Sequence, residues 1–597
     1  MTTYAIFGAG PSGLYTAWRL ITSGKATPDD SITLYEWGIY DFEGTGQYRQ
    51  PAGRICSHHV SLPGQPQDLD ASYIEIGGMR FIEWDGQNYD KDGKPAEGHR
   101  MVSQVIRDLG MQGDVVDFLT TDDPLFFLRG QHFYQSQLGN GVLAPYATPG
   151  NNAHPASDLF TSISGLITGQ TDLTTRAQQC AWYAKGALPA NFNSFVYQPG
   201  SIASNVGYWN VFYDQAGNEG FNYAADAGGY SSNVINWNAA DAAVYNGEFA
   251  PGGTFKTLAG GYSRLFTQLL QQTMQAAGDR GIPIVLEQGR RLHSIVTRDG
   301  RPEFLLASAD DPYKPDGPPQ SADVAFLAMP PESVELIAQA TRYVTYDAVD
   351  FLNAPNVANY LDAVIKQPSY KVAMFFDRPW WADDSVPYKP KVAEGAGNSA
   401  IFGPTITDLP LRQIYYFGNN AMPGYGGKPL YGLLASYDDE QFITFWRQLE
   451  LSVDQRRQEA DYRNLQPLDG GQAAPPEMVR MLRLQLAKVH YGDPDAAYQI
   501  PQAVGTVFMD WGRNPFGAGY HAWAAHYDIC NVMQTIRAPA ALAGEAGAQV
   551  YLVGSAFSND QAWVEGAFCT AESVLVDFLG LDPLIDTSVY PLICSSC

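Results

Sequence analysis

The sequence has no long hydrophobic run and comparatively few positive charges. No stretch of its 597 residues approaches the roughly 20 consecutive apolar residues that a bilayer-spanning helix needs. Lys and Arg number 37 against 63 Asp and Glu, which gives a formal net charge of −26. Nucleic acids and anionic membrane surfaces repel such a protein, so we expect neither as a partner. The 45% of hydrophobic residues predict a folded protein with several cores.

Cysteine is also scarce, with six residues in the chain. This number is too small for a disulfide framework. Cys594 and Cys597 are spaced as C-x-x-C but lie in no thioredoxin-like pattern, so we expect plain tail residues. No charged leader precedes the first predicted strand, and we therefore expect a cytoplasmic protein.

The first 36 residues carry the strongest pattern. An apolar run at 4–7 predicts a buried strand and leads directly into GAGPSG at 8–13. Apolar residues at helical spacing follow over 14–21, and a second apolar run at 32–35 ends at Glu36. Strand, glycine turn, helix, strand and acid in this order are typical of a dinucleotide-binding unit.

Each part of this unit has a physical role in holding a dinucleotide. Gly8 permits the tight turn, Gly10 lets the backbone approach a pyrophosphate, and Gly13 lets the helix pack on the strand. The phosphates lie at the positive end of the helix. Glu36 accepts hydrogen bonds from ribose hydroxyls and would repel a 2′-phosphate, which argues against NADP. The predicted contacts are Gly8, Gly10, Pro11, Ser12, Gly13 and Glu36.

Other catalytic motifs are missing. There is no second G-x-G-x-x-G, and one dinucleotide without a nicotinamide site beside it points to FAD. H-E-x-x-H, zinc-ligand spacing, a Walker loop and G-x-S-x-G do not occur either. Metal-dependent hydrolysis, nucleotide hydrolysis and serine esterase chemistry therefore have no support, and we predict no metal site.

Strand patterns like those of the dinucleotide-binding unit recur far along the chain, at 283–287, 292–296, 304–307 and 322–328. We therefore predict an α/β fold with a discontinuous, Rossmann-like FAD-binding domain of the glutathione-reductase type. Its expected segments are 1–85, 255–330 and 540–597, with a mixed-sheet substrate domain at 86–145 and 331–539 and a helical, aromatic-rich insertion at 146–254 that shapes the substrate entrance. Within the substrate domain, 424–432 is predicted as a loop and 438–449 as a helix.

Motifs spread over nearly the whole chain resemble those of the flavin amine oxidases, and within them the L-amino acid oxidases. Beyond GAGPSG and Glu36 they are AGR at 52–54, GGMRF at 77–81, LAGGYSRL at 258–265, ADVAFLAMP at 322–330, YKVAMFFDRPWWADD at 370–384, TDLPLRQIYY at 407–416 and AWVEGAF at 562–568. Their shared order makes the resemblance specific.

The resemblance implies further cofactor contacts. Arg54 would reach the pyrophosphate, the backbone at Leu292 the adenine, and the 554–564 segment the ribityl chain and flavin ring. The implied contacts are Gly53, Arg54, Gly78, Met79, Arg80, Leu292, Gly554, Ser555, Trp563 and Val564. Two residues depart from the family pattern: Ala52 replaces a glycine before Arg54, and Ser555 replaces a Glu on the ribitol.

Two residues are implied to act on the substrate. Arg80 would clamp a substrate carboxylate, since a guanidinium can form two parallel hydrogen bonds with it. Lys371 stands in an apolar strand, where the family places a lysine that holds a water against flavin N5; an edge position facing solvent is the alternative. Ala562, Trp563 and Tyr437 are implied substrate contacts, Trp563 as a wall of an aromatic pocket.

The resemblance implies oxidative deamination of an L-amino acid by FAD and molecular oxygen, with a 2-oxo acid, ammonia and hydrogen peroxide as products. An amino acid 2-monooxygenase would release an amide and carbon dioxide instead. A monoamine or polyamine oxidase would not depend on Arg80. A prenyl-protein carrier of related fold would not use FAD as an oxidant. The resemblance to this family also suggests a homodimer.

Overall fold

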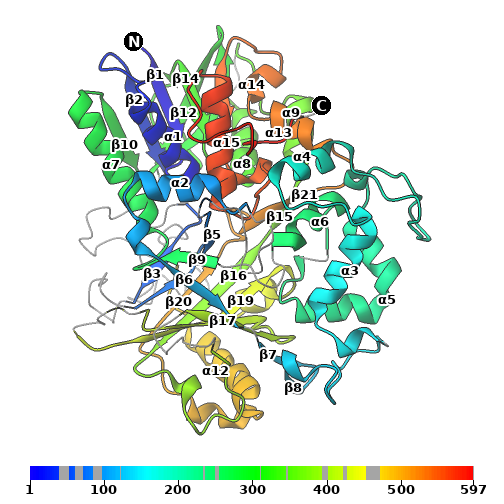
Figure 1. The fold of residues 1–597 in the computed structure, drawn as a ribbon. Coiled ribbons are helices and arrows are strands. Elements are labelled where there is room, and N and C mark those ends of the chain that lie inside the picture. The colour runs from blue at the N-terminus through cyan, green and yellow to red at the C-terminus, as the bar shows by residue number, and fades with distance from the viewer. Residues whose placement is uncertain are drawn as a thin grey trace.

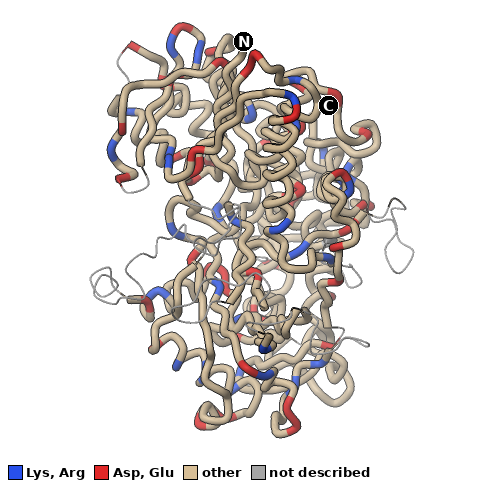
Figure 2. The backbone as a smooth tube through the Cα atoms, turned by 90° about the vertical axis from the view of Figure 1, so that its left-hand side faces the viewer, with Lys and Arg blue, Asp and Glu red and all other residues tan. Residues whose placement is uncertain are grey.

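The computed structural model describes residues 1–38, 53–60, 72–84, 86, 97–121, 123–148, 150–232, 235–248, 255–308, 311–344, 347–392, 401–420, 422, 427–451 and 471–595. A nucleotide-binding part lies at the top, a mixed sheet at the bottom and a group of helices at one side (Figure 1). Both labelled chain ends belong to the upper part. Figure 2 shows Lys and Arg interspersed with Asp and Glu over the height of the molecule, so the excess of acid is not confined to one end.

A parallel sheet forms the centre of the upper part, in the order β10-β2-β1-β14-β22. Its strands are β1 (Thr3–Phe7), β2 (Ser31–Glu36), β10 (Ile284–Gln288), β14 (Val324–Leu327) and β22 (Gln549–Leu552). Three stretches that are far apart in sequence thus supply one sheet, and the predicted α/β class is confirmed. Ligands of such sheets bind beyond the carboxyl ends of the strands, where β1 and β2 deliver the glycine turn and Glu36.

Alternate residues of β1 face two separate cores, as the pleat of a strand requires. Tyr4 and Ile6 pack on one side, against α1 (Pro11–Thr22), α2 (Arg100–Asp108), α7 (Arg264–Arg280) and α15 (Val564–Asp577). Ala5 and Phe7 pack on the other side, against β11 (Arg290–Arg298), β12 (Arg301–Ser308) and α8 (Pro331–Thr341). Strand β13 (Gln320–Ser321) extends the β11-β12 hairpin.

A mixed sheet forms the lower part. Its order is β20 (Gly505–Asp510), β16 (Ser369–Phe376), β19 (Tyr431–Asp439), β18 (Gln413–Gly418), β17 (Phe402–Thr407), β6 (Val115–Thr120), β9 (Phe255–Leu258) and β5 (Phe81–Ile82). Helix α12 (Pro476–Tyr491) packs beneath it. Strand β7 (Leu125–Leu128) also joins this sheet by pairing with β17, and β8 (Gln131–Tyr134) pairs with β7. Two separate pairs are β3 (Ser57–His59) with β4 (Tyr73–Glu75) and β15 (Val364–Gln367) with β21 (Tyr520–Trp523).

Strand β19 corrects the sequence prediction. The pattern favoured a loop as far as Gly432 and a helix from Asp438, whereas the structure has a strand between β16 and β18, and helix α10 (Ile443–Arg447) begins only later. The strand is buried on both faces, so it lacks the alternation of polar and apolar residues that marks a half-exposed strand.

Helices α3 (Ala156–Thr168), α4 (Arg176–Lys185), α5 (Tyr208–Ala227) and α6 (Ala239–Glu248) form the group at the side (Figure 1). Helices α9 (Pro355–Leu361), α13 (Ile529–Thr535) and α14 (Pro539–Leu542) lie near the top. Within the described ranges, no helix combines the length and apolar character that crossing a membrane demands.

Cys180 of α4 and Cys594 form a disulfide with a Cα–Cα distance of 4.9 Å. This bond links the helical group to the end of the chain. The prediction that Cys594 is a plain tail residue is therefore wrong, because a pairing across 414 positions leaves no trace in local spacing. Cys597 lies outside the described residues.

Candidate active site

Three adjoining cavities form one elongated site between the two sheets. The first contains Glu36, and it shares Gly10 and Gly53 with the second. The second shares Arg54 and Trp563 with the third. The site therefore runs from the carboxyl end of β2 to the face of the mixed sheet. An extended dinucleotide with a flat ring at its far end has this shape.

The glycine turn between β1 and α1 leaves no space for side chains at two positions. A Cβ on Gly8, where φ is +113°, would lie 2.3 Å from the carbonyl oxygen of Ala328. A Cβ on Gly13 would lie 1.9 Å from the carbonyl oxygen of Gly8. Gly10 caps α1 and lines the cavity, so the positive end of the helix points at the place where a pyrophosphate would bind.

Glu36 ends β2 and is buried. Its Oε2 accepts a hydrogen bond from the N–H of Ala9 at 2.6 Å, and its Oε1 accepts one from the N–H of Gly38 at 2.7 Å. These bonds fix the carboxylate at the wall of the first cavity, which Leu292 also lines. A carboxylate has about four acceptor positions, so two backbone bonds do not exhaust it.

Arg54 lines the second and third cavities, directly after Gly53, whose φ is +59°. Its Nη1 donates to the carbonyl oxygen of Gly519 at 3.1 Å. Burial lowers the pKa of Arg54, against the opposing attraction of the Glu332 carboxylate. A cation in this position would gain stability from a bound pyrophosphate.

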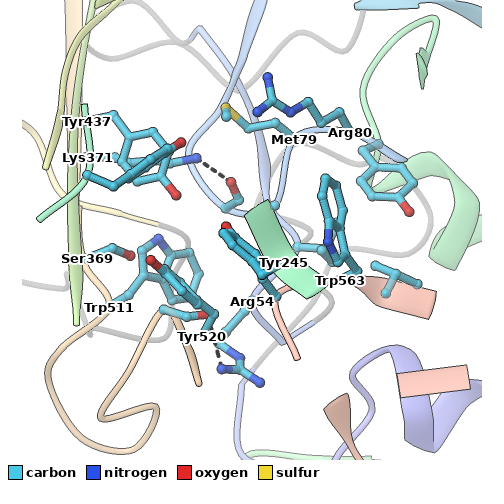
Figure 3. Close-up of a pocket in the computed structure, with 18 residues that line it drawn as sticks. Arg54, Met79, Arg80, Tyr245, Ser369, Lys371, Tyr437, Trp511, Tyr520 and Trp563 are labelled. Carbon is cyan, nitrogen blue, oxygen red and sulfur yellow. Dashed lines mark hydrogen bonds between the residues drawn. The ribbon is translucent and has the colours of Figure 1, made fainter. Parts of the chain in front are cut away.

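The third cavity has aromatic walls and is lined by the basic side chains of Arg54, Arg80 and Lys371. No acid is among the described residues that line it. Figure 3 shows Lys371 and Tyr437 on one side of the space and Trp563 on the other, with Arg80 above and Arg54 below. The aromatic lining residues are Tyr230, Tyr245, Tyr262, Tyr437, Trp511, Tyr520 and Trp563. Such walls exclude water and favour a flat ring.

Lys371 is buried in β16 with 3% of its surface exposed. Its Nζ donates to the carbonyl oxygens of Gly77 at 2.5 Å and Glu75 at 3.3 Å (Figure 3 draws the first), and it lies 4.3 Å from the ring centre of Tyr437. Burial lowers the pKa of Lys371 to about 7, although the Glu75 carboxylate opposes this shift. The amine can therefore gain or lose a proton near neutral pH, which an edge lysine facing solvent could not.

Glu75 is a buried acid beside this lysine that the sequence did not identify as part of the site. Its carboxylate accepts hydrogen bonds from the N–H of Tyr262 at 2.7 Å and from Oγ of Ser57 at 2.8 Å. Burial raises the pKa of Glu75 to about 7, against the lowering effect of these bonds and of Lys371. The available signal was an acid inside an apolar strand, directly before GGMR.

Arg80 lies directly before β5 and lines the third cavity. Its guanidinium carbon is 4.0 Å from the ring centre of Phe255 and 5.2 Å from that of Phe118. Stacking on rings uses the face of the guanidinium and leaves its N–H edge for polar partners. The stack therefore suits a guanidinium that receives a carboxylate.

The remaining predicted residues also gather here. Trp563 caps α15, and its ring lies 4.7 Å from that of His99 in a T-shaped contact. Of all residues predicted to contact cofactor or substrate, Gly13 alone lies off the cavity walls, because its role is to pack α1 on β1. The others that line the walls include Pro11, Ser12, Gly78, Met79, Gly554, Ser555, Ala562 and Val564.

The helical group contributes two lining residues that the sequence did not single out. Tyr230 and Tyr245 line the third cavity, and the ring of Tyr230 lies 5.3 Å from that of Tyr437. Tyr262, from the LAGGYSRL motif, lines it as well. An aromatic-rich segment was the only signal for Tyr230 and Tyr245, and it did not say which rings face inward.

Comparisons with known proteins agree with this geometry. No protein-family model matches the chain. Aplysianin-A of Aplysia kurodai is 23% identical over 601 residues, covering 96% of this chain and 89% of that protein. L-amino-acid oxidase 4 of Hebeloma cylindrosporum is 27% identical over 217 residues, 36% of this chain and 29% of that protein.

Among solved structures, a redesigned putrescine oxidase has a TM-score of 0.58 at 13% identity, covering 97% of this chain and 99% of the other. A protoporphyrinogen oxidase of an Exiguobacterium species has a TM-score of 0.53 at 12% identity, covering 96% and 98%. The chain therefore shares its fold with these two oxidases. These relatives and the sequence motifs support a likeness to the flavin amine oxidase family.

Proposed function

We propose that the protein is an FAD-dependent L-amino acid oxidase. It would convert an L-amino acid, oxygen and water into a 2-oxo acid, ammonia and hydrogen peroxide. The observation that carries the proposal is that Arg80 and Lys371 line one aromatic cavity at the far end of the dinucleotide site. The partial match to an L-amino-acid oxidase supports the same substrate class.

The first two cavities fit FAD. The N-terminus of α1 and Arg54 would hold the pyrophosphate, and Glu36 the adenosine ribose, while Leu292 lines the adenine end. The carboxylate of Glu36 would repel a 2′-phosphate. When bound, the flavin supplies the two-electron acceptor for the reaction, and the protein supplies binding and orientation.

Arg80 would bind the substrate carboxylate. Its planar fork can form two parallel hydrogen bonds with a carboxylate, which fixes the direction of the α-carbon. Correct orientation in a dry cavity accounts for a large share of the rate enhancement in such reactions. Lys371, half protonated near pH 7, would hold a water or a proton beside the reacting atoms.

The charges of the third cavity favour an amino acid over a diamine. Arg80 is a cation, Lys371 is one in its protonated form, and among the described lining residues there is no carboxylate to offset the second ammonium of a diamine. A substrate carboxylate, in contrast, neutralises one of these charges. The likeness to putrescine oxidase concerns the fold alone.

The test is a peroxide assay of the purified protein over the common L-amino acids, their D-enantiomers and the matched amines without a carboxylate, with flavin absorbance followed under nitrogen. We expect L-amino acids alone to bleach the flavin and to yield peroxide. Release of an amide and carbon dioxide would instead show a 2-monooxygenase. Protein without flavin absorbance would contradict any oxidase.

Arg80→Lys keeps the charge and removes the fork, and we expect KM for L-amino acids to rise by about 10- to 100-fold, the value of one or two charge-assisted hydrogen bonds. The exposed Arg342→Lys is the matched control and should leave KM unchanged. Equal activity of Arg80→Lys on amino acids would contradict the carboxylate clamp.

A further inference from the structure

The Cys180–Cys594 disulfide lies directly behind the wall of the cofactor site. Asn559 donates from Nδ2 to Sγ of Cys594 at 3.0 Å and to Sγ of Cys180 at 3.8 Å. The same segment then forms part of the wall, because residues 561–564 line the second cavity and residues 562–564 line the third as well. One residue, Asp560, therefore separates the contact with the disulfide from the residues that face the cofactor.

Helix α4 holds this segment through a second contact, one turn before Cys180. Arg176 and Asp560 form an ion pair at 2.7 Å, with 4% and 5% of their side chains exposed. Residues four apart in a helix share one face, so α4 presents Arg176 and Cys180 together to residues 559–560. The N–H of Trp563 in turn donates to the carbonyl oxygen of Asp560 at 3.0 Å. The contacts of α4 therefore help to hold the turn that carries Trp563.

The stretch that contains Cys594 packs against the same contact. Arg176 donates to the hydroxyl of Tyr590, and that hydroxyl donates to Oε1 of Glu565 at 2.9 Å. The disulfide ties the residues after Tyr590 covalently to α4. Opening the bond leaves only non-covalent contacts to hold this layer in place, and segments held in that way open locally at a lower cost in free energy.

The disulfide can be approached from one of its two sulfurs. Cys180 is partly exposed, whereas Cys594 is fully buried. A thiolate of a dithiol can therefore attack Sγ of Cys180, so that Cys594 leaves as a thiolate, and the second thiol of the dithiol then displaces Cys180 from the mixed disulfide. The dithiol is oxidised and the protein disulfide is reduced.

Hydrogen peroxide can close the bond again. The thiolate of Cys180 attacks one peroxide oxygen, the O–O bond breaks, and a sulfenic acid and hydroxide form. The thiolate of Cys594 then displaces hydroxide from the sulfenic acid and forms the S–S bond. Two thiols and one hydrogen peroxide give one disulfide and two waters.

We propose that the Cys180–Cys594 pair is a reversible redox site that controls how tightly the protein holds its flavin. In the disulfide form, Asn559 and the turn at Trp563 are ordered before the cofactor binds. In the dithiol form, binding must order them, which weakens the affinity. That turnover closes the bond rests on the proposed function, since hydrogen peroxide is a product of that reaction.

Flavin affinity measured without substrate tests the site. Wild-type protein is reduced with dithiothreitol and desalted under nitrogen, alkylation counts the thiols, and circular dichroism verifies the fold. We expect the Kd for FAD, measured by the fluorescence of released flavin, to rise by about tenfold or more, since ordering a few side chains on binding costs this much. Added hydrogen peroxide should restore it. A bond that dithiothreitol cannot open in the folded protein, or an unchanged Kd once it is open, would overturn the proposal.

Two variants separate this role from plain stabilisation. Asn559→Ala keeps the disulfide and removes its contact with the wall, so the Kd should be raised in the oxidised form already and dithiothreitol should change it little. Cys180→Ser should match the reduced wild-type protein and respond to neither reagent. Asn140→Ala removes an exposed amide that donates to the carbonyl oxygen of Ser136, and it is the matched control, which should respond as the wild type does. A wild-type response in Asn559→Ala would contradict the coupling, and this variant decides the question if Cys180→Ser fails to fold.

Turnover distinguishes this proposal from the proposed function. Reduced protein supplied with an L-amino acid and oxygen should close its own disulfide, and catalase should prevent the closure. If no L-amino acid yields peroxide, the proposed function fails, while the response of the Kd to dithiothreitol and added peroxide still decides the redox site. If L-amino acids yield peroxide but the reduced protein keeps the oxidised protein's Kd, only the redox site is overturned.

Discussion

The ammonium nitrogen of Lys371 lies 2.5 Å from the carbonyl oxygen of Gly77. This hydrogen bond joins strand β16 of the mixed sheet to the GGMR turn that begins the carboxylate site. Lys371, which would transfer protons, and Arg80, which would bind the substrate, are thus held at fixed positions relative to each other by the backbone of this turn. A side chain held this way can act on a proton without losing its place.

Replacing Lys371 by Met should separate the two halves of the catalytic cycle. Methionine fills similar space but cannot hold a water or a proton, so flavin reoxidation should slow by about 10²-fold, the lower range for a positioned acid or base. Flavin reduction by substrate under nitrogen should change little. Stopped-flow absorbance measures both steps. Lys366→Met, at an exposed position of β15, is the control, and an equal loss in both steps would contradict the assignment.

Glu75→Gln should change the pH dependence of the same step. The pKa of Lys371 is lowered to about 7 by burial, and the Glu75 carboxylate opposes that shift. Removing the carboxylate therefore lowers the pKa of Lys371 further, and the amine becomes neutral at a lower pH. The limb of the reoxidation profile near pH 7 should move to lower pH by about one unit. Lys371→Met should lack this limb altogether, and a profile of Glu75→Gln identical to wild type would refute the coupling.

Gly8→Ala should abolish cofactor binding. The added methyl group would lie 2.3 Å from the carbonyl oxygen of Ala328, and the backbone there has φ of +113°. Both effects push the turn away from the pyrophosphate position. Protein purified after this change should show less than about a tenth of the wild-type flavin absorbance, since a strained turn of this kind costs roughly 1–3 kcal/mol before the clash is counted.

The matched control is Gly278→Ala. Gly278 lies within α7, where a Cβ meets no atom within 4 Å. The substitution should raise the free energy of unfolding by about 0.5–1 kcal/mol, because Ala is the better helix former, and it should leave flavin content unchanged. Loss of flavin in this variant as well would show that the flavin loss in Gly8→Ala is not specific to the glycine turn.

The cofactor site was predictable from sequence because its residues form local patterns. The turn from Gly8 to Gly13 and the acid at Glu36 belong to one unit of strand, turn and helix, whose spacing is set by the period of each element. Arg80 and Lys371 stood in segments that resemble a family, and the structure brings them to one cavity. These contacts depend on short stretches that carry their own signal.

Other parts of the site depend on contacts between distant segments. Tyr230 and Tyr245 reach the cavity because the helical group packs against the mixed sheet, where the ring of Tyr230 contacts that of Tyr437, and nothing in their own segment shows this. Glu75 looked like one acid in a short strand until Lys371 was placed beside it. Strand β19 was missed since both of its faces are buried, which removes the alternation on which strand prediction depends.

The Cys180–Cys594 disulfide should stabilise the folded protein. It closes a loop of 414 positions, and bonds of this kind contribute about 2–5 kcal/mol to the free energy of unfolding. Cys180→Ser and Cys594→Ser should each lower it by that amount. The double variant should lose no more than either single one, since both lose the same bond. Additive losses in denaturant unfolding would show that the two cysteines act separately.

The same bond bears on the compartment, for which the sequence favoured the cytoplasm. Cytosolic glutathione and thioredoxin keep thiols reduced, whereas structural disulfides persist in oxidising surroundings. We therefore expect protein isolated from its native source, alkylated before unfolding and again after reduction, to gain label on Cys180 and Cys594 only in the second step, which would favour an oxidising compartment. Labelling of both residues after unfolding without reductant would show free thiols in the native protein and would support the cytoplasmic location instead.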